Sequence, residues 1–128
     1  MATSSHPTLY ERLGGVYRIA TVVDNLIDRV MDDPRLNANP RVDEAHHRVS
    51  AAGFKYLVTE MVCWASAGPQ QYSRRSMRES HQDLRITAAE WDAFLDDLQH
   101  TLDTFGVPPA EQEELKAIVA STRAEIVV

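Results

Sequence analysis

The apolar residues of this chain recur every three or four positions, and this spacing constrains the fold more than any other feature. Segment 16–33 has this period and ends before Pro34, and segment 46–65 has it around Phe54 and Leu57. Such a period places side chains on one face of an α-helix. No segment alternates convincingly between apolar and polar residues, as a half-buried strand would. The sequence therefore predicts an all-α protein.

Boundary signals support further helices in the second half of the chain. Thr87 followed three residues later by Glu90 matches a capping box, which predicts a helix start. Gly106 is a typical residue to end that helix, and Pro108 and Pro109 suit the first turn of the last one. The expected apolar stripes of these two helices are Trp91, Phe94, Leu95, Leu98, Leu102 and Phe105, and then Leu115, Ile118, Val119, Thr122 and Ile126.

Two stretches between these elements are less regular. Segment 36–44, "LNANPRVDE", is predicted to be a loop because of its Asn and Pro content, and segment 74–82 is predicted to be a short helix. We therefore expect about four substantial helices and two short ones. We expect residues 1–128 to form a single domain, with residues 1–7 as a flexible N-terminus, because 128 residues is close to the commonest domain size.

Charge and cysteine content exclude several classes of function. The net charge of −6 argues against nucleic acid as the main partner, because no basic stripe could neutralise phosphates. The single Cys63 excludes an intrachain disulfide and predicts a reduced, cytoplasmic protein in which this thiol is a small buried hydrophobe. The N-terminal residues contain no apolar signal segment, and no run of about 18 apolar residues predicts a membrane span.

His81 is the most informative candidate for chemistry. Together with Met77 and Leu84 it occupies positions i, i+4 and i+7, so one imidazole stands in the only apolar stripe of an otherwise polar short helix. It could be a core histidine hydrogen-bonded to a backbone carbonyl. It could also be an axial ligand of haem iron, since a neutral imidazole on an apolar wall suits that metal. The apolar faces at 19–31, 54–62 and 91–105 could supply the slot for the macrocycle.

Other polar clusters point less clearly to a ligand. His46 and His47 are adjacent, so on a helix they point about 100° apart and cannot chelate one ion from one face. Asp43 and His47, at i and i+4, could bind a metal weakly, but no H-E-x-x-H or paired C-x-x-C predicts a zinc site. No C-x-x-C-H motif is present, which we take to exclude covalent haem attachment. The arginines at 74, 75 and 78 read as a solvated face that could also pair with haem propionates.

Several short motifs, taken in order and spacing, resemble a known family. They are "LYERLGG" (9–15), "AGPQQYS" (67–73), "SMRESH" (76–81), "IT" (86–87) and "FGVP" (105–108). Over residues 8 to 128 the chain resembles the group I truncated haemoglobins, small haem proteins with a shortened globin fold. The resemblance implies a two-over-two helical sandwich, haem b as cofactor, and His81 as the proximal ligand of the iron. The Nδ1–H of His81 would then donate to a backbone carbonyl of its own helix.

The resemblance also implies which residues surround the haem. Tyr72 would hydrogen-bond a propionate. The remaining residues would contact the two faces of the haem: Met77, Leu84, Ile86, Trp91, Phe94 and Leu98 would form the proximal wall, and Phe54, Val58, Met61 and Val62 the distal wall.

The chain departs from the family pattern in ways that bear on function. Ile27 and Val58 stand where the family typically has a Tyr and often a Gln that hydrogen-bond bound dioxygen. "NANP" (37–40) replaces a usual Phe, Ala67-Gly68 replaces a glycine pair, and Arg74 replaces a glycine. The distal pocket is therefore expected to be apolar. A distal donor is worth about 1–3 kcal/mol, so without it dioxygen should leave roughly ten- to a hundredfold faster.

Three functions follow from these patterns. The first is a haem protein that binds oxygen, nitric oxide or carbon monoxide, with a role in oxygen binding and transport or in nitric oxide dioxygenation to nitrate, which would need a reductase partner. The second is a six-coordinate redox or electron-transfer protein that uses His46 or His47 as a distal ligand. The third is a globin-like interaction module that has lost haem, which the missing distal Tyr and Phe favour and His81 opposes.

Overall fold

The computed structural model describes residues 7–70, 81 and 84–127. Tyr72, Met77, the three arginines at 74, 75 and 78, and most of the short helix expected at 74–82 lie outside the described residues.

The described part of the chain is built from α-helices. Their bounds are α1 Leu9–Arg12, α2 Gly15–Asp32, α3 Pro34–Asn37, α4 Pro40–Arg48, α5 Ala51–Ala65, α7 Ala88–Thr104, α8 Pro109–Ala120 and α9 Arg123–Ile126. Within these described residues the sole β-type pairing is an isolated bridge between Ile86 and Val127. The prediction of an all-α protein is therefore confirmed.

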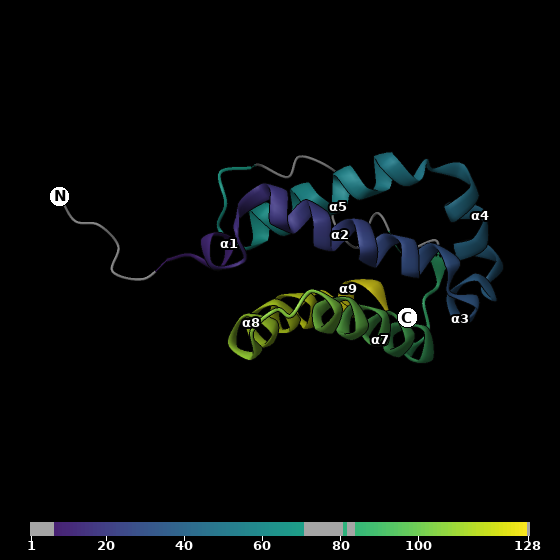
Figure 1. Ribbon diagram of the computed structural model, residues 1–128. Coiled ribbons are helices and arrows are strands. Elements are labelled where there is room, and N and C mark those ends of the chain that lie inside the picture. Colours follow the sequence, from purple (N-terminus) through teal and green to yellow (C-terminus); the bar gives the residue numbers. More distant parts are fainter. Residues whose placement is uncertain (1–6, 71–80, 82–83, 128) are drawn as a thin grey trace.

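The helices form two layers. In Figure 1, α2 and α5 lie side by side in one layer, and α7 and α8 form the other layer beneath them. Helix α2 packs along α5 and also against α7, so it joins the layers. This arrangement is the two-over-two sandwich that the sequence predicted. No described helix combines the length and apolar character that a bilayer crossing requires.

Two groups of buried side chains hold this arrangement together. The interlayer core contains Leu26, Val30, Leu36, Val42, Ile86, Ala93, Leu98, Leu102, Val107 and Leu115. The α2–α5 core contains Ile19, Val23, Ile27 and Cys63, with Phe54, Val58 and Val62 packed against it. Burying such side chains is the dominant favourable term in folding. The apolar stripe predicted for segment 16–33 therefore contributes to both cores.

The prediction of one helix over 46–65 is wrong, because the helix is interrupted at Val49 and Ser50. Val49 is extended, with φ −100° and ψ 145°, and ends α4. Ser50 then caps α5, and its hydroxyl accepts a hydrogen bond from the amide of Gly53 at 3.0 Å. A serine at this position satisfies an amide that the first turn of a helix leaves unpaired.

The prediction of a loop at 36–44 is also wrong, because this segment is largely helical. Pro34 and Pro40 each occupy the first turn of a helix, and the side chains of Asp33 and Asn39 cap those helices. Proline is favoured at the first helical position, where its missing N–H is not needed and its fixed φ suits the helix. The Asn and Pro residues of this segment therefore act as helix-start signals and not as loop formers.

The boundary signals of α7 are confirmed. Thr87 and Glu90 form the complete capping box, with hydrogen bonds of 2.8 and 3.2 Å. Gly106 follows α7 with φ 61°, in the left-handed region that glycine adopts most easily. Helix α8 ends at Ala120, so the last two residues of its predicted stripe, Thr122 and Ile126, lie beyond it.

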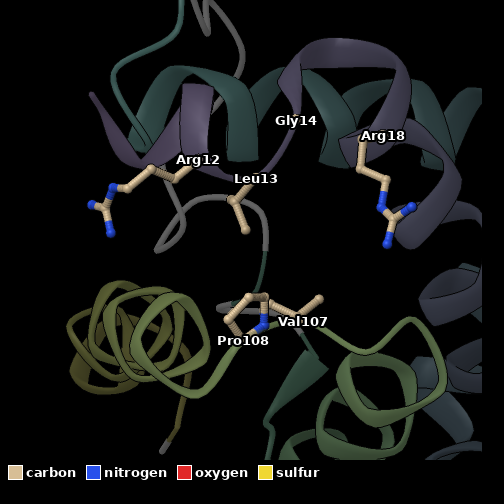
Figure 2. A pocket seen from close by; sticks show the side chains of 6 residues that line it. All are labelled: Arg12, Leu13, Gly14, Arg18, Val107 and Pro108. Atoms are coloured by element: carbon tan, nitrogen blue, oxygen red, sulfur yellow. The ribbon is translucent and has the colours of Figure 1, made fainter.

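The turn between α1 and α2 meets the α7–α8 connection at one end of the molecule. Figure 2 shows Leu13 and Val107 facing each other across this junction, with Arg12 and Arg18 on either side. Arg12 pairs with Glu111 and Glu114 of α8. Arg18 donates to the carbonyl oxygen of Phe105 at 2.9 Å. Both guanidinium groups thus hold the two layers together.

Candidate functional site

The expected distal wall lies along one face of α5. Phe54, Val58, Met61 and Val62 are all half-buried, whereas Cys63, on the side of α5 that faces α2, is fully buried. Behind this wall Ile27 is only 2% exposed. The described residues therefore leave an apolar face of α5 partly uncovered, and every side chain on this wall is apolar.

The expected proximal wall lies in the other layer and in the segment before it. Ile86, Trp91 and Leu98 are buried, while Leu84 and Phe94 are half-buried. The rings of Trp91 and Phe94 pack at a centroid distance of 6.0 Å. Leu84 and Phe94 also pack against the interlayer core, so these residues form one continuous apolar surface with it.

His81 is helical and half-buried, three residues before Leu84. A haem group needs apolar contact on both faces and one basic nitrogen for its iron. Apolar contact could come from the partly uncovered face of α5 on one side and from the apolar surface around α7 on the other. The half-buried imidazole of His81 could supply the nitrogen. The described residues therefore fit haem, although Tyr72 and Met77 lie outside them.

The structure separates the two candidate distal histidines. The side chain of His47 is 77% exposed, and its Nδ1 lies 2.7 Å from the carbonyl oxygen of Asp43 on its own helix. His46 is half-buried and packs against Phe54 of the distal wall, with ring centroids 6.4 Å apart. The helix interruption at Val49 and Ser50 turns the chain between α4 and α5, and His46 of α4 therefore lies beside α5.

The hydrogen bonds of Asn37 determine which nitrogen of His46 carries the proton. The amide Nδ2 of Asn37 donates to the carbonyl oxygen of Met31 at 2.7 Å. Its Oδ1 therefore faces His46 Nδ1, also at 2.7 Å, and can only accept. Nδ1 of His46 must then be the donor, which leaves Nε2 as the nitrogen with the free lone pair. Burial lowers the pKa of His46, which favours this neutral form.

Asn37 is a residue whose importance the sequence did not reveal. It lies in the segment predicted to be a loop, nine residues before the imidazole that it orients. An asparagine beside a proline-rich turn is usually a turn or cap residue, so no local signal points to this contact.

Cys63 has the environment that the sequence predicted. It is fully buried in the α2–α5 core, and burial raises the pKa of its thiol. A protonated thiol in an apolar environment is a poor nucleophile. Cys63 therefore serves as a small apolar side chain beneath the distal wall.

Comparison with known proteins places this architecture in a family. Residues 8–128 match the bacterial-like globin family. A group 1 truncated haemoglobin of Synechocystis sp. is 34% identical over 119 residues, which cover 89% of this chain and 87% of the relative. A group 1 truncated haemoglobin of Tetrahymena pyriformis is 24% identical and covers 93% of both chains.

Solved structures of such proteins have the same fold. The 2/2 haemoglobin of Synechococcus sp., determined in the cyanomet state with covalently attached haem, superposes with a TM-score of 0.80 at 27% identity and covers 94% of this chain and 98% of that one. The haemoglobin of Chloroflexus aurantiacus superposes with a TM-score of 0.75 at 27% identity and covers 96% of this chain and 100% of that one. Sequence, architecture and these likenesses agree over nearly the whole length, and the chain belongs to the bacterial-like globins as a member of the group 1 truncated haemoglobins.

Proposed function

We propose that this protein binds haem between α5 and α7, with His81 as the axial ligand of the iron, and that it binds a diatomic gas there. The observation that carries the proposal is the membership of residues 8–128 in a globin family, together with the partly uncovered apolar face of α5 in this structure. When bound, haem iron supplies an open coordination position for oxygen, nitric oxide or carbon monoxide.

The side chains of this chain have distinct roles in that proposal. His81 would donate its Nε2 lone pair, and a hydrogen bond from its Nδ1 would set the orientation of the ring. Val58 and Met61 would cover the distal side and exclude water, while Trp91 and Leu98 would do the same on the proximal side. Excluding water favours an apolar macrocycle and slows loss of the cofactor.

The experiment that tests His81 compares it with a control histidine. Purified protein should take up one equivalent of hemin and develop a Soret band. His81→Ala should lose or shift that band. His100→Ala should not, because His100 is 61% exposed on the surface of α7 and its Nδ1 lies 2.8 Å from the carbonyl oxygen of Asp96. A wild-type chain that takes up no hemin would refute the haem proposal and leave the haem-free interaction module as the surviving function.

We further propose that the haem is held without a covalent bond, as haem b. The absence of C-x-x-C-H supports this. The Synechococcus sp. haemoglobin structure contains covalently attached haem, so the type of attachment needs a direct test in this protein. Extraction with acidified butanone should remove the chromophore, and the mass of the protein should then equal that of the bare chain. A mass higher by one haem after extraction would contradict the proposal.

The apolar distal wall predicts weak retention of dioxygen. Ile27 and Val58 belong to or pack against the α2–α5 core and offer no hydrogen-bond donor to a ligand. Val58→Gln should slow dioxygen dissociation roughly ten- to a hundredfold, because one charge-assisted hydrogen bond is worth about 1–3 kcal/mol. Tyr56→Gln, on the exposed side of α5, is the matched control. Equal dissociation rates in wild type and Val58→Gln would contradict the proposal that Val58 faces the bound gas in a pocket without a hydrogen-bond donor.

A second candidate function is a six-coordinate redox protein with His46 as the distal ligand. The observation that favours it is the hydrogen bond from His46 Nδ1 to Asn37, which leaves Nε2 with its lone pair beside the distal wall. A carbonyl oxygen that accepts from the remote nitrogen is the usual partner of a metal-binding histidine. In this tautomer His46 Nε2 can ligate iron but cannot donate a hydrogen bond to a gas.

The visible spectrum of the reduced protein distinguishes these two candidates. Six-coordinate, low-spin bands that are lost in His46→Ala and kept in His47→Ala would support the redox function. Five-coordinate bands in wild type would support gas binding. Consumption of nitric oxide with formation of nitrate, in the presence of dioxygen and a reductant, tests dioxygenation. We also propose a cytoplasmic location, which the single reduced thiol supports.

A further inference from the structure

A buried pair of carboxyl groups joins α3 to α7, apart from the candidate haem site. Asp33 caps α3 and is 6% exposed, and Asp97 lies within α7 and is 8% exposed. Arg35 lies between them: its Nη2 is 2.9 Å from Asp33 Oδ2 and 3.4 Å from Asp97 Oδ1. The two helices are therefore connected through charged groups that the proposed gas binding does not use.

One oxygen of this cluster has no donor. Asp33 accepts three hydrogen bonds from Arg35, through its backbone amide, Nε and Nη2. Asp97 Oδ2, by contrast, is buried without a hydrogen-bond partner among the described residues. A buried carboxylate oxygen that lacks a donor is costly, and a proton on the carboxyl group reduces that cost because it removes the charge. Asp33 and Asp97 both contact Nη2 of Arg35, so the two carboxyl groups share one small buried site, where two carboxylates that would both ionise favour the uptake of one proton.

Burial and two neighbouring carboxylates favour the protonated form of Asp97, and the Arg35 charge opposes them. Asp33, Arg35 and Asp96 are the charged groups that act on it from α3 and α7. The Arg35 guanidinium is shared among all three carboxyl groups, and His100 lies against Asp96, with its Nδ1 3.5 Å from Oδ1. Burial and the neighbouring Asp33 raise the pKa of Asp97 to about 7, while Arg35 lowers the pKa of Asp33 to about 2.

We propose that Asp33 and Asp97 share one proton and act as a pH-sensitive latch, which holds the α3 corner against α7 and releases it when the proton is lost. The α3 corner contains Leu36, buried in the interlayer core, and Asn37, which orients His46. Ionised together, the two carboxylates would repel each other in a buried environment with one guanidinium between them. The latch does not depend on the proposed haem function.

The sign of the pH dependence follows from linkage. The folded chain holds the Asp97 proton more tightly than the unfolded chain, whose aspartates titrate near pH 4. Stability should therefore fall as the pH rises from about 4 to about 7, by up to tenfold in the folding equilibrium constant per pH unit. Asp33 acts oppositely at lower pH, because its lowered pKa contributes stability that is lost between about pH 4 and 2.

The test compares the stability of wild type and Asp97→Asn between pH 5 and 8, in one haem state. Asparagine can donate a hydrogen bond to Asp33 and cannot ionise. The ratio of the two folding equilibrium constants should change by up to about a hundredfold in favour of Asp97→Asn, since about two pH units lie between pH 5 and 7. Asp92→Asn is the control, because Asp92 is exposed on the same helix, is not among the charged groups that act on Asp97, and should keep the wild-type pH dependence.

Two further measurements make the proposal refutable. Carbon-13 NMR of wild type should show the Asp97 carboxyl titrating near neutral pH, and this needs no variant to fold. The amides of Leu36 and Asn37, which donate to the Asp33 carbonyl, should lose hydrogen-exchange protection between pH 6 and 8 in wild type but not in Asp97→Asn. Parallel stability profiles, an Asp97 titration in the ordinary carboxyl range, or equal exchange in both proteins would each overturn the latch.

Discussion

Ala67 occupies a position at the end of α5 where glycine is the favoured residue. Its φ is 70°, in the left-handed region. The amide of Ala67 donates to the carbonyl of Trp64 at 3.2 Å, and the amide of Gly68 donates to that of Cys63 at 2.8 Å. This pair of hydrogen bonds is the Schellman arrangement, in which the residue after the helix cap is left-handed. We predict that Ala67→Gly stabilises the protein.

The magnitude follows from two opposing terms. A residue with a Cβ in the left-handed region costs about 1–2 kcal/mol relative to its preferred conformations. Replacing Ala67 with glycine removes this cost but offsets part of the gain, because glycine loses about 0.4–1 kcal/mol more conformational free energy than alanine on folding. The side chain of Ala67 is exposed, so little packing is lost. The net stabilisation should be about 1 kcal/mol, which corresponds to a rise in Tm of roughly 4 °C.

The matched control lies at the end of α7. Gly106 has φ 61° and the same pair of hydrogen bonds, from its own amide to Asp103 and from the amide of Val107 to Leu102. A Cβ built on Gly106 would have no atom within 4 Å, so Gly106→Ala tests backbone conformation alone. Urea denaturation should show a loss of about 1 kcal/mol for Gly106→Ala and a similar gain for Ala67→Gly. If Gly106→Ala destabilises while Ala67→Gly has no effect, the left-handed assignment of Ala67 is refuted.

Three further substitutions or reactions probe the fold. Gly68→Ala should destabilise the protein by at least 1 kcal/mol (an order-of-magnitude value for overpacking), because a Cβ there would lie 2.5 Å from Tyr10 Cδ1; unchanged urea midpoints would contradict that close approach. Thr87→Ala should lose about 1 kcal/mol with the capping box, whereas Thr87→Ser should retain most of it in the same assay. Iodoacetamide should label Cys63 only as the protein unfolds, since the thiol is fully buried; rapid labelling of folded protein would contradict this.

Much of the architecture could be predicted because it depends on local signals. The period of the apolar residues predicts helices, and the Thr87–Glu90 capping box predicts where α7 begins. Local signals are ambiguous at the α3 corner. Pro34 and Pro40 can end a helix or begin one, and only the backbone conformations of Asp33 and Asn39 decide between these outcomes.

The candidate site divides in the same way. His81 and the apolar residues Ile27 and Val58 can be identified in the sequence, because family motifs place them, and the role of His81 as the iron ligand stays a prediction. The difference between His46 and His47 could not be predicted. Their sequence contexts are nearly identical, and only the bend between α4 and α5 places one against Phe54 and leaves the other in solvent.

Residue types and their spacing along the chain are enough to predict the fold class, the family and an apolar character for the expected distal wall. Only the packing of the helices brings Asn37 to His46, and brings Asp33 and Asp97, more than sixty residues apart, to the same Arg35 guanidinium. The physical reason is that the protonation of a buried imidazole or carboxyl depends on its desolvation and on the groups that face it. Those conditions arise only when α3 has packed against α4 and α7.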